Sequence, residues 1–85
     1  MKRLNQPQPA RVTLDSVRRP ASVSWGARGA VRRAVVEHVL DCWYVDEGWW
    51  SDAPLRRMYY ECQLAGGVRL IVVYDLITQR WFVQR

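Results

Sequence analysis

With 85 residues, the chain is long enough for one small domain with a thin hydrophobic core. Its two cysteines, Cys42 and Cys62, and its single histidine, His38, are too few for a structural zinc site. The longest apolar run, Leu70 to Tyr74, is too short to span a bilayer, and the first residues form no apolar leader. We therefore expect a cytoplasmic protein with no membrane segment, metal or cofactor, whose reduced thiols are buried.

The formal charge of +5 is distributed unevenly along the sequence. Residues 1–33 hold eight Lys and Arg against one acid, whereas residues 34–85 hold five Arg against seven acids. A basic segment of this kind is typical of proteins that contact a polyanion, although solvated basic tails are also common. If the partner is DNA, the candidate contacts are Arg18, Arg19, Arg28, Arg32 and Arg33.

Residues 1–10 are rich in Pro and Gln, which predicts a flexible basic lead-in without fixed structure. Residues 11–85 are expected to form a single small β domain. Val12 and Leu14 alternate with polar residues, so the first strand is predicted to start at Arg11.

The segment Ala21 to Trp25 also alternates and predicts a second strand, which Gly26 to Gly29 ends in a turn. Residues 30–42 fit both a helix and a strand. Helical spacing is shown by Val31, Val35, Val39 and Cys42. The high valine content favours a strand instead, and the adjacent pairs Val35-Val36 and Val39-Leu40 then imply a bulge or burial on both faces.

The last third of the sequence predicts three strands with short turns. Leu55 to Leu64 and Val68 to Tyr74 flank Ala65-Gly66-Gly67, and Asp75 to Gln79 leads into Arg80 to Gln84. Together with the earlier strands this predicts an all-β fold. We expect a small antiparallel meander that closes into a partly open, SH3-like barrel of five or six strands.

Every aromatic residue except Trp25 lies between Trp43 and Phe82. Neighbouring residues on a strand point to opposite faces, so one of Trp49 and Trp50 is expected to be partly exposed. Arg57 and Arg80 stand beside aromatics and are expected to pair with a carboxylate, either Asp75 or Asp52. The candidate partner-binding residues are Trp49, Trp50, Arg57, Tyr59, Tyr60, Arg80 and Trp81.

The order of several motifs resembles a bacterial domain of unknown function. The motifs are Trp25-Gly26, Val36-x-x-Val39-Leu40-x-x-Trp43, Trp49-Trp50, Arg57-x-Tyr59-Tyr60, Gly67, Asp75 and Arg80-Trp81-Phe82-x-Gln84. Over residues 20–85 the chain is similar to the segment that ends ImuB-type proteins, the inactive relatives of Y-family DNA polymerases in SOS mutagenesis cassettes. The resemblance favours a strand for residues 30–40 and implies a role in DNA damage response or translesion synthesis.

Two functions remain open from the sequence. The first is a non-catalytic adaptor that binds a polymerase-like or recombinase-like repair protein through exposed aromatics. The alternative is a nucleic-acid-binding small barrel that uses its basic third and aromatic stacking. Catalysis is not expected, because His38 lies in an apolar stretch without a recognisable nucleophile. A homodimer through an unpaired edge strand is a further expectation.

Overall fold

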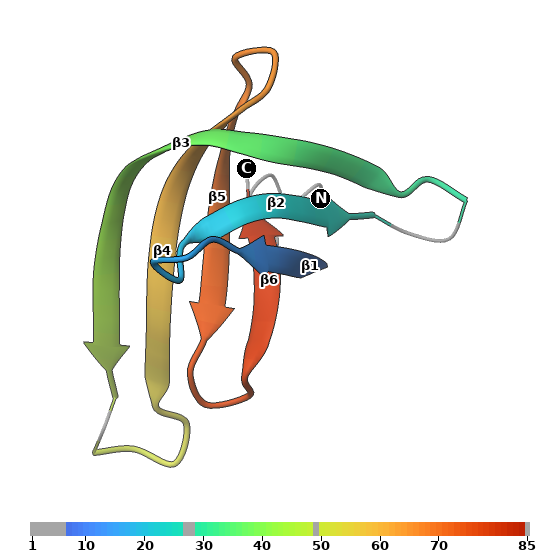
Figure 1. Ribbon diagram of the computed structural model, residues 1–85. Helices are drawn as coiled ribbons and strands as arrows, with labels where there is room; N and C mark the ends of the chain where they lie inside the picture. Colours follow the sequence, from blue (N-terminus) through green and yellow to red (C-terminus); the bar gives the residue numbers. More distant parts are fainter. Residues whose placement is uncertain (1–6, 27–28, 49, 85) are drawn as a thin grey trace.

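The computed structural model describes residues 7–26, 29–48 and 50–84, and these form a six-stranded antiparallel sheet. The strands are β1 (Gln8–Leu14), β2 (Pro20–Trp25), β3 (Arg32–Glu47), β4 (Leu55–Leu64), β5 (Arg69–Asp75) and β6 (Arg80–Gln84). Each strand pairs with the next along the chain, and β6 pairs with β1, so the sheet closes into a barrel (Figure 1). The described part of the chain contains no helix that could cross a membrane.

The predicted all-β meander barrel is confirmed, with six strands and a complete closure. The helical alternative for residues 30–42 is wrong, because this segment belongs to the 16-residue strand β3. Hydrogen bonding to β2 through Arg32–Val35 and to β4 through Val36–Glu47 outweighs the local helical spacing of its valines.

Two irregularities bend β3. Its register with β4 shifts between Val36 and His38 and again between Val39 and Asp41, so Glu37 and Leu40 are each an extra residue on this strand. An extra residue kinks a strand and increases its twist. The bends carry β3 from its pairing with β2 into a long antiparallel ladder with β4 (Figure 1), and they confirm the predicted bulge.

The first strand starts at Gln8, three residues before the predicted start at Arg11. Gln8, Pro9 and Ala10 pair with Val83, Phe82 and Trp81 of β6. These three residues were assigned to the flexible lead-in, yet they make the contact that closes the barrel. Residues 1–6 lie outside the described part of the chain.

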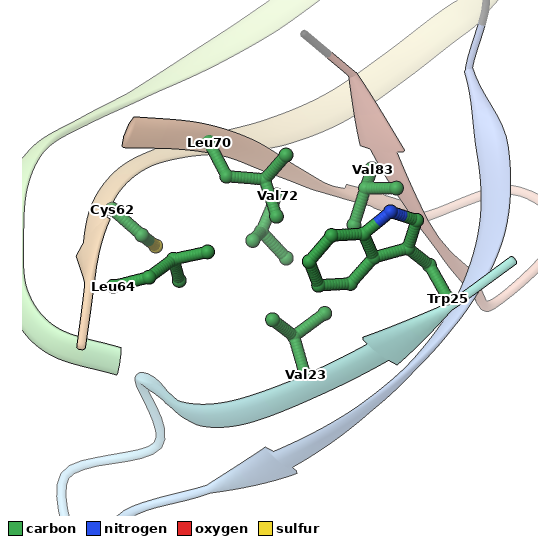
Figure 2. Packing of buried hydrophobic residues seen from close by; sticks show 7 residues of the cluster. All are labelled: Val23, Trp25, Cys62, Leu64, Leu70, Val72 and Val83. Atoms are coloured by element: carbon green, nitrogen blue, oxygen red, sulfur yellow. The ribbon is translucent and has the colours of Figure 1, made fainter. Parts of the chain in front are cut away.

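The core lies inside the barrel and is built by four strands (Figure 2). Its members are Val23 and Trp25 from β2, Cys62 and Leu64 from β4, Leu70 and Val72 from β5, and Val83 from β6. Burial raises the pKa of the Cys62 thiol to about 11, so this cysteine is protonated at neutral pH. The expectation of burial is therefore correct for Cys62 but wrong for Cys42, which is exposed where β3 runs past the barrel.

A glycine is required directly after β2. Gly26 has a φ of +121°, and a Cβ added there would meet the carbonyl oxygen of Ala30. The Trp25-Gly26 pair thus combines a core indole with a backbone bend that a larger residue would strain.

Candidate functional site

Part of β3 is a free sheet edge. Because β2 reaches only Val35 of β3, residues Asp41–Glu47 pair with β4 on one side and with no strand among the described residues on the other. We call Asp41–Glu47 the β3 edge. A strand with one open side carries unpaired backbone groups that another extended chain can bind.

Exposed aromatics project from both faces of the β3 edge. Trp43 is 39% exposed and Tyr44, its neighbour on the opposite face, is 44% exposed. Trp43 lies opposite Tyr59 of β4, and the two rings stack with centroids 5.4 Å apart and planes within 5° of parallel. This stack holds the Trp43 side chain in one orientation at the surface.

Tyr44 is held by a polar network on the other face. The Arg56 Nε donates to the Tyr44 hydroxyl oxygen at 3.1 Å, and the hydroxyl donates to the Asp46 Oδ2 at 3.3 Å. The Arg56 Nε also lies 3.9 Å from the same Asp46 oxygen. An aromatic ring with a fixed polar tip can contact both apolar and polar groups of a partner.

Beside the aromatic stack, a partly buried ion pair joins β4 to β5. The Arg57 Nε donates to the Asp75 Oδ2 at 3.2 Å, and the Asp75 Oδ1 accepts the backbone N–H groups of Ile77 and Thr78 at 2.9 and 3.0 Å. Burial alone would raise the pKa of Asp75, but these backbone donors and the Arg57 guanidinium outweigh burial and lower it. The predicted Arg–Asp pair is confirmed for Arg57 with Asp75, but the same expectation is wrong for Arg80, which joins no ion pair among the described residues, and Asp52 is exposed in the β3–β4 turn.

The barrel separates the predicted partner-binding residues into two groups. Strand alternation places Arg57, Tyr59 and Arg80 on the outer face, whereas Tyr60 and Trp81 point inward and pack against the core. The Tyr60 and Trp81 ring centroids lie 6.0 Å apart, and both rings are partly buried. The inward pair therefore packs with the core, whereas Arg57, Tyr59 and Arg80 lie on the outer face of the barrel.

The double tryptophan follows the β3 edge. Trp50 is 72% exposed, which confirms that one of the two indoles faces solvent, and Trp49 lies outside the described residues. The sequence did not mark Trp43 and Tyr44 as site residues. Trp43 and Tyr44 are exposed because β2 does not extend along the part of β3 that carries them. In the sequence, only the greater length of the β3 segment compared with the β2 segment could have indicated this exposure.

The predicted nucleic-acid residues do not form one patch. Arg18 and Arg19 lie in the β1–β2 turn, whereas Arg32 and Arg33 begin β3 at the other end of β2. Six strand residues separate these two ends by about 20 Å. Arg28 lies outside the described residues.

The described residues at these surfaces form no metal-binding cluster. Groups of three or more His, Cys, Asp or Glu side chains that could hold a metal ion do not occur among residues 7–26, 29–48 and 50–84. His38, the single histidine, is exposed on β3 between the two bulges.

Comparison with known proteins identifies no family for the chain. No protein-family model matches it, and no curated protein or solved structure matches it either.

Proposed function

We propose that the protein is a non-catalytic adaptor that binds an extended segment of a partner protein along the β3 edge. The observation that carries the proposal is an unpaired strand edge with a solvent-exposed aromatic on each face, Trp43 and Tyr44. Main-chain hydrogen bonds to a sheet edge provide affinity, and side chains on alternate faces provide specificity. Trp and Tyr are also the residues most enriched at the centres of protein interfaces.

The charge of the β3 edge favours a basic partner segment. Asp41, Asp46 and Glu47 are exposed there, although the molecule as a whole carries +5. The Asp41 Oδ1 accepts the backbone N–H of Cys42 at 2.8 Å, so the Asp41 side chain already occupies this one N–H donor of the β3 edge. Charged groups on an edge oppose pairing between identical edges. A second copy of this chain would place acid against acid, so a basic segment of another protein fits better.

The cellular role that accords with this surface is DNA damage response or translesion synthesis. The resemblance of residues 20–85 to the segment that ends ImuB-type proteins supports this role, and a polymerase-like or recombinase-like repair protein is the proposed partner. The motif residues Trp43, Arg57 and Tyr59 lie together beside the β3 edge. The proposed compartment is the cytoplasm, where repair proteins meet bacterial DNA.

Replacing Trp43 and Tyr44 together with Ala is expected to weaken partner binding by at least 30-fold, about 2 kcal/mol. The two rings supply exposed apolar area that only the complex buries. Calorimetric titration of the purified polymerase-like and recombinase-like proteins of the same cell, at low and high salt, measures the effect. Because exposed Asp41, Asp46 and Glu47 would pair with basic residues of the partner, wild-type affinity is expected to fall as salt rises, whereas the loss caused by removing the two rings should change little with salt.

The matched control is Val17→Ala with Val68→Ala. These valines are 67% and 58% exposed in the β1–β2 and β4–β5 turns, away from the β3 edge, and partner binding should be unchanged. An unaltered affinity of the Trp43→Ala, Tyr44→Ala variant would contradict the docking surface. If neither repair protein binds the wild type, the proposed role in DNA repair is wrong.

A further inference from the structure

We propose that a row of three arginines across β3, β2, β1 and β6 binds the phosphodiester backbone of single-stranded nucleic acid. Arg11 of β1 pairs with Ser24 of β2, and Ser24 pairs with Arg33 of β3, so the two arginines flank one serine on the outer face. The pairing of Ala10 with Trp81 places Arg80 next to Arg11 across the β1–β6 seam. We call Arg33, Arg11 and Arg80 the arginine row.

Hydroxyl groups lie beside the arginine row. Thr13 and Ser22 are paired across β1 and β2, two residues along from Arg11 and Ser24, and therefore on the same face. Arg11, Arg33 and these hydroxyl residues line a shallow hollow of about 570 Å³. Arginine, serine and threonine side chains are the usual donors to phosphate oxygens in nucleic-acid complexes.

The charge of the arginine row is not neutralised within the described residues. The ion pairs there join Arg56 to Asp46, Arg57 to Asp75 and Arg69 to Glu61, and none includes Arg11, Arg33 or Arg80. The closest carboxylate to Arg80 along the ladder is Asp75, which is buried and bonded to Arg57. An external anion is therefore the partner with complementary charge.

Apolar groups beside the row favour a single strand over a duplex. Pro9 and Phe82 face each other across the β1–β6 seam, and each is two residues from an arginine of the row, on the same face. Arg11, Arg80 and Phe82 also line one continuous surface hollow. Unpaired bases can lie against such an apolar surface while the phosphates bind the arginines, whereas a duplex keeps its bases stacked inside.

The size of the row sets the expected salt dependence. Four neighbouring strands span about 14 Å between the outer two, so the three arginines can contact about three phosphates. Three contacts to a single strand predict a slope of about −2 for log K against log salt. Arg33 of the arginine row lies near the start of β3, whereas the β3 edge is the end of the same strand. The protein could therefore bind nucleic acid and a protein partner at the same time.

The test is fluorescence anisotropy of a labelled oligothymidylate at several salt concentrations. The wild type should bind at low salt with a slope of about −2, and Arg11→Gln with Arg33→Gln should weaken binding at least tenfold and bring the slope to about −0.7. Both side chains are exposed, so the variant should unfold at the wild-type temperature.

The control removes the same charge elsewhere. Arg18→Gln with Arg19→Gln removes two exposed arginines of the β1–β2 turn and leaves the arginine row intact, and its affinity should stay within about threefold of the wild type. Equal losses in the two double variants, no wild-type binding at low salt, or equally tight binding of a duplex of the same length would each overturn the proposal. Loss of nucleic-acid binding by the Arg11→Gln, Arg33→Gln variant with protein-partner binding retained would separate this site from the adaptor surface.

Discussion

Replacing Trp25 with Ala should destabilise the protein by about 3–5 kcal/mol, because the substitution removes the largest side chain of the core and leaves a cavity. The indole is only 8% exposed and lies among Val23, Val72 and Val83 inside the barrel (Figure 2). A domain of this size has a total stability of the same order. Far-UV circular dichroism during urea unfolding measures the loss independently of tryptophan fluorescence.

The control for this substitution is Val17→Ala. Val17 is 67% exposed in the β1–β2 turn, so its truncation should change the free energy of unfolding by no more than about 0.5 kcal/mol. A loss below about 1 kcal/mol for Trp25→Ala would mean that the indole is not packed as described.

Asp75→Asn is expected to cost about 2–3 kcal/mol of stability. Asp75 is 7% exposed and its carboxylate accepts bonds from Arg57 and from the backbone of Ile77 and Thr78, and the amide would leave the half-buried guanidinium without its counter-charge. Asp52→Asn, at an exposed position in the β3–β4 turn, is the matched control and should be neutral. Urea unfolding at neutral pH compares the variants.

The stabilisation supplied by the Asp75 carboxylate should also depend on pH. The folded-state pKa of Asp75 is lowered relative to the unfolded value of about 3.9, so its stabilisation is complete above that value and is lost as pH falls through the folded pKa. The stability gap between wild type and Asp75→Asn should therefore narrow below about pH 4. A gap that stays constant from about pH 7 to about pH 3 would show that the Asp75 charge does not stabilise the fold.

The sequence predicted the strands whose signals are local. Leu55–Leu64 and Arg80–Gln84 have the predicted bounds, because alternation, aromatic residues and the flanking turn residues agree there. The segment that became β3 was ambiguous for the opposite reason. Its adjacent apolar pairs Val35-Val36 and Val39-Leu40 interrupt the alternation at the two bulges, and its pairing with two different strands cannot be read from local spacing.

The surfaces were harder to predict than the strands. Arg57 was expected to pair with Asp75 or Asp52 because it stands beside aromatics, and only the β4–β5 register selects Asp75. The arginine row was not predicted as a unit, since Arg11 and Arg80 meet only when β6 closes onto β1. Arg18 and Arg19 are close to Arg33 in sequence, but the length of β2 keeps them apart.

The most direct test of the adaptor is amide hydrogen exchange of the protein with and without its bound repair partner. Added-strand binding predicts slower exchange across Asp41–Glu47, with the amides of the paired β5 strand unchanged. Protection confined to other strands, with the β3 edge exchanging at its free rate, would contradict docking along this edge.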